Sequence, residues 1–434
     1  MPRRLDAREP GFEAAFAALL ATKRDTEADV ARVVAEILAE VRARGDAALI
    51  DYTERFDRIR LTPETLRIPE AEIAAAAGRC PREVVDALEL AAERIEAHHR
   101  RQLPADLDYT DEAGLRLGHR WTAVAAAGLY VPGGTAAYPS SVLMTALPAK
   151  VAGVARRVMV VPAPDGNLNP LVLAAAHLAG VTEAYRVGGA QAVGALAYGT
   201  ETIRPVDKIV GPGNVYVAAA KRQVFGTVGI DMIAGPSEIL VVADAANDPA
   251  WIAADLLAQA EHDTAAQAIL MTDDAGFAEA VADAVEAQLA RLERRAVAGA
   301  SWDAHGAIIL LADFDAAPAL IDRVAPEHLA LALADPDALA ARVRNAGAIF
   351  LGRHTPEALG DYLAGPNHVL PTARSARFSS GLSVLDFMKR SSLIACTPEG
   401  LKSLGPATIA LARAEGLEAH ALSVAIRLDD SQGD

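Results

Sequence analysis

The chain has 434 residues and a formal net charge of −16 at pH 7. This length exceeds what one hydrophobic core usually serves, so it predicts two or more domains. The acidic balance argues against nucleic acid, which proteins bind through a basic face, and against anionic membranes. With 52% hydrophobic and 5% aromatic residues, the composition is typical of a soluble globular protein rich in small apolar side chains.

Two cysteines, Cys80 and Cys396, occur in the whole sequence. Two thiols can form neither a disulfide framework nor a thiolate zinc site, which favours a reducing, cytoplasmic location. The N-terminal residues lack an apolar segment, so no signal or transit peptide is expected. The longest uncharged stretch, 121–149, contains prolines and glycines that would break a membrane helix. It therefore predicts a buried strand, a loop and a helix.

Residues 1–105 are expected to form a peripheral N-terminal helical segment. In one of its stretches the apolar residues recur at helical spacing, which places Val84, Leu88, Ala91 and Ile95 on one face. Near the end of this segment, His98 and His99 lie in "EAHHRRQ". Charged neighbours on both sides favour a solvated helix end for these two histidines.

From about residue 120, short apolar runs rich in Val and Ile alternate with Ala-rich helical stretches, the rhythm of βαβ units and parallel sheets. The runs fall into two series, first "VAAAGLYVP", "RRVMVVPAP", "AYRVGGA" and "DKIVGPG", then "EILVVAD", "AQAILMTD", "AIILLAD" and "AGAIFLG". We therefore predict an α/β fold with two doubly wound domains, at 106–237 and 238–380. The remaining tail, 381–434, is too small for its own core and is expected to dock on another domain or subunit.

Gly/Pro clusters follow several strands of the first series: "YVPGG", "VGGAQ" and "VGPGN". Ligands of open parallel sheets bind beyond the carboxyl ends of the strands, where glycine lets a backbone approach a phosphate or ribose closely. The dinucleotide fingerprint G-x-G-x-x-G is absent, and Gly211-Pro-Gly213 is only a fragment of it. From the residues alone, an unspecified ligand and simple tight turns are equally good interpretations.

A metal site is suggested further along, where an apolar helix ends in Gln259, Glu261 and His262. Gln259 and His262 are three residues apart and share a helix face, so an amide oxygen and an imidazole would stand side by side. The alternative is an ordinary helix C-terminus, where the dipole stabilises a histidine.

Two later segments contain candidate proton-transfer groups. "RVAPEHLAL" places Glu327 beside His328, and an acid next to an imidazole suits two separate proton transfers. A helix N-terminus after Pro326 is the structural alternative. "LGDYLAGPNHVLPT" contains Asp361 and His368, and Asp361 could simply cap a turn.

The segments "KIVGPGNVY" and "GIDMIAGPSEILVVADAANDPAWIAADLLAQAEHDT" closely resemble the signature of the histidinol dehydrogenase family, and the resemblance covers essentially the whole chain. It implies an NAD-dependent zinc enzyme of histidine biosynthesis with incomplete Rossmann-like domains. Such an enzyme oxidises L-histidinol through L-histidinal to L-histidine with two NAD+. It further implies a homodimer with shared active sites, because the C-terminal tail crosses to the neighbouring subunit.

The resemblance also assigns roles to individual residues of this sequence. It makes Glu327 and His328 the general bases. It implies one zinc ion per subunit, held by Gln259, His262, Asp361 and His420. It places NAD+ against Tyr130, Gln191 and Asn214. It places the substrate against Ser237, Gln259, His262, His328, Asp361, His368, Glu415 and His420.

Neither cysteine lies in a context typical of a site, so the aldehyde step cannot use a thiohemiacetal and the aldehyde must be hydrated. Glu327 suits the activation of water, and His328 suits removal of the alcohol proton. Two rival functions remain. One is a related zinc and NAD dehydrogenase for another small alcohol, such as a sulfonated diol. The other is a non-catalytic protein that binds a metal or a small molecule.

Overall fold

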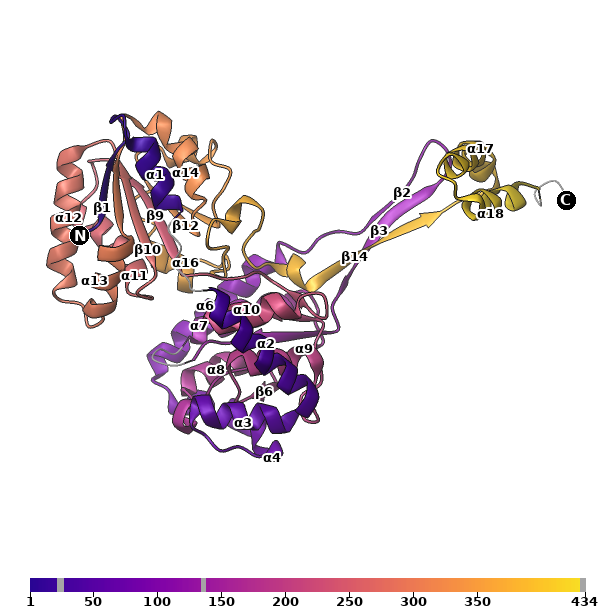
Figure 1. Ribbon diagram of the computed structural model, residues 1–434, viewed down its shortest axis with the longest axis horizontal. Helices are drawn as coiled ribbons and strands as arrows, with labels where there is room; N and C mark the ends of the chain where they lie inside the picture. Colours follow the sequence, from indigo (N-terminus) through magenta and orange to yellow (C-terminus); the bar gives the residue numbers. More distant parts are fainter. Residues whose placement is uncertain (22–26, 134–137, 430–434) are drawn as a thin grey trace. The chain divides into compact units, whose positions relative to one another are not determined.

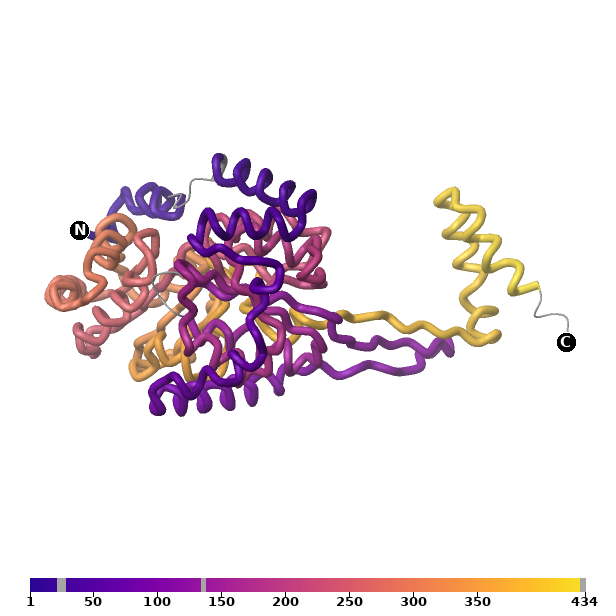
Figure 2. The backbone as a smooth tube through the Cα atoms, turned by 90° about the horizontal axis from the view of Figure 1, so that it is seen from below, coloured from indigo at the N-terminus to yellow at the C-terminus, as the bar shows by residue number. Residues whose placement is uncertain are grey.

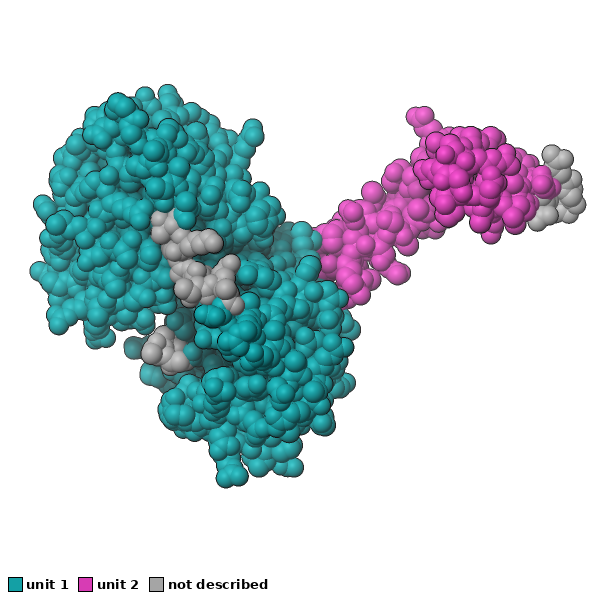
Figure 3. Space-filling view, in the orientation of Figure 1, with its two compact units in different colours: residues 1–102, 125–387 teal, residues 103–124, 388–434 magenta. Residues whose placement is uncertain are grey.

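The computed structural model describes residues 1–21, 27–133 and 138–429, which form two compact units (Figure 3). Unit 1 contains residues 1–102 and 125–387, and unit 2 contains residues 103–124 and 388–434. The division expected from the sequence, with a boundary near 105 and a tail from 381, differs from this at both places. The boundaries differ because strands in the segment 107–123 form one sheet with residues 388–395, which are distant in the sequence.

The first sheet of unit 1 has five parallel strands in the order β6-β5-β4-β7-β8. Its strands are β4 (Ala126–Tyr130), β5 (Arg156–Val160), β6 (Glu183–Tyr185), β7 (Lys208–Val210) and β8 (Gly229–Ile230). The connections contain η2 (Pro164–Gly166) and four helices, α7 (Pro139–Val151), α8 (Pro170–Leu178), α9 (Gly189–Tyr198) and α10 (Val215–Val224). This strand order is that of a Rossmann sheet without its sixth strand.

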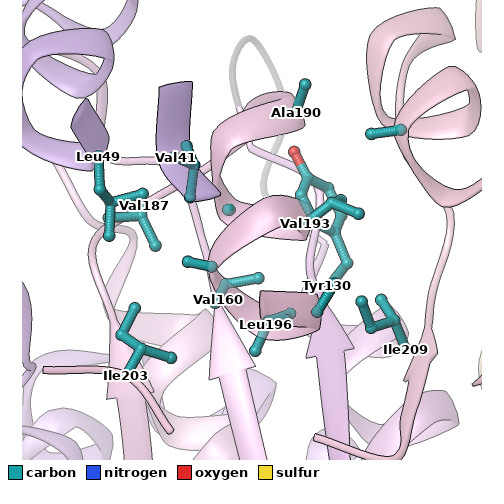
Figure 4. Packing of buried hydrophobic residues seen from close by; sticks show 14 of the residues in the cluster. Val41, Leu49, Tyr130, Val160, Val187, Ala190, Val193, Leu196, Ile203 and Ile209 are labelled. Carbon is teal, nitrogen blue, oxygen red and sulfur yellow. The ribbon is translucent and has the colours of Figure 1, made fainter. Parts of the chain in front are cut away.

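A hydrophobic core lies between this sheet, α9 and the N-terminal helices. Tyr130 and Val160 extend from the sheet toward Leu196 of α9, and Val41 and Leu49 close the cluster from the other side (Figure 4). Small residues of α9 allow this close approach, since a methyl group on Gly194 would lie 3.1 Å from the Leu38 side chain. The Ala- and Gly-rich composition thus permits tight helix-on-sheet packing.

The second sheet of unit 1 has six parallel strands in the order β1-β11-β10-β9-β12-β13. They are β1 (Arg3–Asp6), β9 (Glu238–Ala243), β10 (Gln267–Thr272), β11 (Ala307–Leu310), β12 (His328–Ala332) and β13 (Ala348–Leu351). Its α-helices are α11 (Pro249–Ala260), α12 (Ala275–Leu289), α13 (Arg295–His305), α14 (Ala317–Val324), α15 (Pro336–Ala340) and α16 (Glu357–Tyr362). Short 3-10 turns lie at η3 (Phe314–Ala316) and η4 (Ser375–Arg377), and a further one, η5 (Val384–Phe387), packs against α7.

Strand β9 shows that this sheet is covered by helices on both faces. Its side chains alternate, so Ile239 and Val241 join a cluster with α11, α12 and α13. Leu240 and Val242 join a second cluster with α1 (Phe12–Leu20) and α14. The mixed α/β architecture with parallel sheets expected from the sequence is therefore confirmed.

The N-terminal segment is helical over most of its length, in α2 (Glu27–Arg44), α3 (Asp46–Asp57), α4 (Pro63–Leu66), α5 (Glu70–Ala74), η1 (Ala76–Arg79) and α6 (Arg82–Arg100). Its first residues depart from the expectation, because β1 pairs with β11 at the edge of the second sheet. The interpretation of His99 as solvated is wrong. His99 is buried and its Nδ1 lies 2.8 Å from the Ile95 carbonyl oxygen.

The uncharged stretch 121–149 contains the end of β3 (Arg116–Ala123), the buried strand β4 and the buried helix α7, as predicted. The turn between β4 and α7 lies partly outside the described residues. Within the described ranges, no helix is both long enough and apolar enough to cross a membrane.

Unit 2 consists of an antiparallel sheet and a helical hairpin. The strand order is β14 (Met388–Ala395), β3 and β2 (Leu107–Thr110), and Figures 1 and 2 both show β14 running beside β3. Helices α17 (Pro398–Ala414) and α18 (Glu418–Asp429) pack against each other. A methyl group on Gly405 would lie 2.9 Å from Leu428, so glycine permits this close contact.

Candidate active site

Two of the three predicted cofactor residues, Tyr130 and Asn214, lie at or shortly after the carboxyl ends of neighbouring strands in the first sheet. Tyr130 is the last residue of β4, and Gly211 follows the adjacent strand β7. The strand order reverses between these two strands, which is where open α/β sheets bind ligands. The backbones approach so closely that a methyl group on Gly211, whose φ is +112°, would lie 2.2 Å from the Tyr130 carbonyl oxygen. Glycine is therefore required at this turn.

The start of α9 forms the second part of this region. The backbone N–H of Gly189 donates to the Tyr130 hydroxyl oxygen over 3.0 Å, and Figure 4 shows that hydroxyl directed toward Ala190. Burial raises the pKa of Tyr130 to about 12, so the phenol stays neutral. Gln191 is 1% exposed, and its Oε1 has no hydrogen-bond partner among the described residues. A buried amide oxygen without a partner at a helix start is suited to a ligand donor.

Asn214, the third predicted cofactor residue, begins α10. Its Oδ1 accepts from the backbone N–H groups of Tyr216 at 3.1 Å and Val217 at 3.2 Å, so it is the helix N-cap. The preceding turn is held by a buried ion pair between Lys221 and Asp231. Lys221 Nζ donates to the Gly211 carbonyl at 2.9 Å, and Gly211 N–H donates to Asp231 Oδ2 at 2.8 Å. This clamp fixes the loop that leads to Asn214.

The predicted catalytic pair lies at the amino ends of the central strands of the second sheet. His328 is the first residue of β12, and Glu327 directly precedes it. The structural alternative of a helix N-terminus is therefore wrong for this pair. The neighbouring strand β9 begins with Glu238, whose backbone N–H donates to Glu327 Oε2 at 2.9 Å. The Glu238 carboxylate accepts from the backbone N–H of Ala373 at 3.1 Å, which connects the pair to the segment after α16.

The hydrogen bonds of His328 determine which of its ring nitrogens can act as a base. Nδ1 lies 2.9 Å from the Glu238 carbonyl oxygen, and because a carbonyl only accepts, Nδ1 bears the proton. Nε2 then has the lone pair, and it has no hydrogen-bond partner within the described ranges. Burial lowers the pKa of His328 to about 3, so the ring is neutral at pH 7. A neutral imidazole with a free lone pair can accept a proton.

Gln259 is fully buried on α11, whose apolar residues Ile252, Leu256 and Leu257 are also buried. One end of its side-chain amide lies 2.9 Å from Glu357 Oε1 and 3.2 Å from the Glu238 carbonyl oxygen, and because both oxygens are acceptors, this end is the NH2 group. Glu357 begins α16 and its Oε1 lies 3.4 Å from His328 Nδ1. Helices α11 and α16 and strands β9 and β12 thus meet at one polar cluster.

Asp361 and His368 complete this cluster within unit 1. Asp361 Oδ1 lies 4.0 Å from His328 Nε2, and the Asp361 carbonyl oxygen lies 3.0 Å from His368 Nδ1. Burial raises the pKa of Asp361 to about 6 and lowers the pKa of His368 to about 4. On the other side, His368 Nε2 lies 3.4 Å from the Ser141 hydroxyl of α7.

The other predicted site residues are His262, Ser237, Glu415 and His420. His262 follows α11 and is exposed, and it is near enough to the cluster to contribute to the lowered pKa values of His328 and His368. Ser237 directly precedes β9 and is partly exposed. Glu415 ends α17 and His420 lies on α18, so both belong to unit 2, and both are exposed.

The cluster has the chemistry of a metal site. Ligand atoms of His328, Glu357 and Asp361 lie within 4.8 Å of one another. Asp361 belongs to the zinc set expected from the sequence, and Gln259 of that set donates to Glu357. A carboxylate oxygen is a common zinc ligand, so Asp361 fits a zinc ion, whereas His328 and Glu357 lie outside the expected ligand set.

Sequence reasoning missed three residues of this site, namely Glu357, the backbone and carboxylate of Glu238, and Ser141. Spacing could have indicated Glu357, because it precedes Asp361 by four residues and therefore shares its helix face. Ser141 offers no such signal, since only the tertiary fold brings α7 to His368.

Comparison with known proteins identifies close relatives over the full length. The histidinol dehydrogenase family model matches residues 20–428. The histidinol dehydrogenase of Ruegeria pomeroyi is 65% identical over 433 residues and that of Rhodospirillum rubrum 69% over 430, with 99–100% of each chain covered. The crystal structure of histidinol dehydrogenase from Elizabethkingia anophelis has a TM-score of 0.95 at 35% identity, covering 100% of this chain and 99% of that one.

Proposed function

This chain belongs to the histidinol dehydrogenase family, and we propose that its active site is the buried cluster around Glu327 and His328. The reaction is the NAD-dependent oxidation of L-histidinol through L-histidinal to L-histidine, which ends histidine biosynthesis. One observation carries the assignment of the site: His328 is buried and neutral, with its Nε2 lone pair beside Asp361. The whole-length identity to named relatives disfavours both the sulfonated-diol and the non-catalytic alternatives.

The two bases divide the proton transfers. His328 Nε2 removes the proton of the substrate hydroxyl, and bound NAD+ would take up the hydride from the carbon that carries this hydroxyl, which gives the aldehyde. Glu327 then removes a proton from water as the water adds to the aldehyde carbon. The resulting hydrate anion loses a hydride, to a second NAD+, to give the carboxylic acid. The backbone contacts of Glu238 hold both side chains in place, so neither base reorients between the steps.

The first test is an assay of NAD+ reduction with three alcohols. L-Histidinol should yield two NADH per molecule, whereas ethanol and a sulfonated diol should yield none. Two equivalents require both half-reactions, so this stoichiometry also separates a four-electron enzyme from a simple alcohol dehydrogenase. Reduction with the sulfonated diol and not with histidinol would replace the proposed substrate.

Zinc, when bound, supplies a positive charge that orients the substrate through its imidazole and amine. The proposed ligands are Gln259, His262 and Asp361, together with His420 from the second subunit. We expect His262→Ala to contain much less than one zinc per subunit after dialysis, measured by atomic emission. His177→Ala, on the exposed face of α8, is the control and should keep its zinc. Full zinc retention in the His262 variant would exclude this site.

The nucleotide is proposed to bind at Tyr130, Gln191 and Asn214, where the first sheet reverses its strand order. Asn214→Ala should raise the Michaelis constant for NAD+ far more than that for histidinol. This variant also loses a helix cap, worth about 1 kcal/mol of stability. Asp248→Ala, which removes the N-cap of α11, is the matched control for cap loss alone. A larger change in the constant for histidinol would place the nucleotide elsewhere.

A homodimer with shared sites is the proposed assembly, in a cytoplasmic, reducing compartment. Large apolar side chains of unit 2 support the assembly, since Ile394, Leu411 and Leu422 are 74%, 68% and 60% exposed. Exposed apolar groups at this density are typical of interfaces. Free thiols at Cys80 and Cys396 support the compartment.

A further inference from the structure

Glu357 is a buried acid in a position that should be unfavourable. It is 2% exposed, and burial together with the nearby charges of Asp361, Glu327 and Asp255 raises its pKa well above the usual range. Placing a carboxyl group among other carboxyl groups in a desolvated site costs stability. A buried acid that costs stability is expected to have a function, and the contacts of Glu357 indicate which one.

The contacts of Glu357 decide how the Gln259 amide is oriented. A glutamine amide can present either its oxygen or its NH2 group in a given direction. The Glu357 Oε1 and the Glu238 carbonyl oxygen, at 2.9 and 3.2 Å, both face the same end of this amide. Both are acceptors, so that end must be the NH2 group. His328 Nδ1 lies 3.1 Å from it but already donates its proton to the Glu238 carbonyl.

We propose that Glu357 is a positioning residue that fixes the Gln259 amide with its oxygen toward the zinc ion. This inference rests on the proposed function, which makes Gln259 a zinc ligand. An amide oxygen has lone pairs that a metal can use, whereas the NH2 nitrogen is a donor only. The role requires only that Oε1 accepts, which holds for the ionised carboxylate and for the acid protonated on Oε2. Partners of metal ligands typically contribute 10- to 100-fold to metal affinity.

Glu357→Gln is the central variant, because it preserves the side-chain shape. The introduced amide can offer an NH2 group to Gln259 and thereby stabilise the reversed orientation. We expect the zinc dissociation constant, measured by competition with a chromophoric chelator on the metal-free dimer, to rise by about 10- to 100-fold. Thermal unfolding of the metal-free protein should change little, which separates this effect from a loss of fold.

Asp255→Asn is the matched control for charge. Asp255 lies one turn before Gln259 on α11 and acts on Glu357 through its charge, whereas the amide contact belongs to Glu357. Its variant should therefore leave the zinc dissociation constant close to that of the unmodified protein. The double variant Gln259→Glu with Glu357→Gln exchanges the donor and the acceptor. Its new carboxylate accepts from the new amide and turns its other oxygen to the metal, so zinc affinity should return toward the original value.

Three results would overturn the proposal. The first is unchanged zinc affinity in Glu357→Gln while His262→Ala loses zinc, which leaves the proposed site intact. The second is an equal loss in Asp255→Asn, which would make the effect one of charge. The third is a double variant that binds zinc no better than Glu357→Gln alone. Zinc retention in His262→Ala overturns the site itself, and the role of Glu357 with it.

Discussion

His328→Ala is expected to slow the oxidation of histidinol to histidinal by about 10²-fold or more, the usual effect of losing a general base. The ring has the two properties the step needs, a neutral form at pH 7 and a lone pair on Nε2 held by the Nδ1 contact to the Glu238 carbonyl. Single-turnover measurements of NADH formation from histidinol report this step directly. The Michaelis constant for NAD+ should remain nearly unchanged.

Removal of the buried His328 ring also leaves a cavity. A second variant must therefore show the same loss of activity without creating a cavity of that size. His328→Asn keeps a side-chain N–H that can reach the Glu238 carbonyl but has no equivalent of Nε2. This variant should unfold at a higher temperature than His328→Ala and be equally slow. Recovery of most of the activity in His328→Asn would assign the ring a packing role instead of a chemical one.

Glu327→Gln should separate the two half-reactions. The introduced amide oxygen can still accept from the Glu238 N–H, so the fold around β9 and β12 should persist. Because the amide is not a base, histidinal oxidation, which needs water activation, should fall more than histidinol oxidation. Assays started from histidinol and from histidinal measure the two steps. Equal losses in both steps for the Glu327 and His328 variants would contradict the division of roles.

Mixed dimers should regain activity from two inactive chains. If His420 completes the active site of the neighbouring subunit, a heterodimer of His420→Ala and Glu327→Gln chains has one site with both defects and one site with neither. About half of the normal activity per heterodimer should therefore return. Glu415 and His420 both lie in unit 2, which is compatible with such an exchange.

The two chains are given different affinity tags, unfolded and refolded together, and the doubly tagged dimer is assayed. Refolded homodimers of each variant provide the baseline. Two chains that both carry His420→Ala and Glu327→Gln provide the matched control, because every site is then defective. A confirmed heterodimer with no activity above this baseline would mean that each tail serves its own subunit.

The sequence by itself determined the features that depend on local order along the chain. Eight apolar runs became the strands β4, β5, β6, β7, β9, β10, β11 and β13, since buried parallel strands need continuous apolar residues. The expectation that Gln259 and His262 share a face of one helix is wrong, because α11 ends at Ala260, Gln259 is buried and His262 is exposed. The family was identifiable from motifs alone.

The tertiary structure decided what depends on distant contacts. Strand β1 is too short and polar to be recognised, and it forms only because β11 offers an edge. The sequence placed the segment 107–123 in the first α/β domain. In the structure it pairs instead with β14, which lies more than 260 residues later and could not be recognised as its partner. Glu327 and His328 looked like a helix start, yet pairing of β12 with β9 made them a strand end. The orientation of Gln259 depends on Glu357, nearly a hundred residues later, because hydrogen-bond partners are chosen in space and not in sequence.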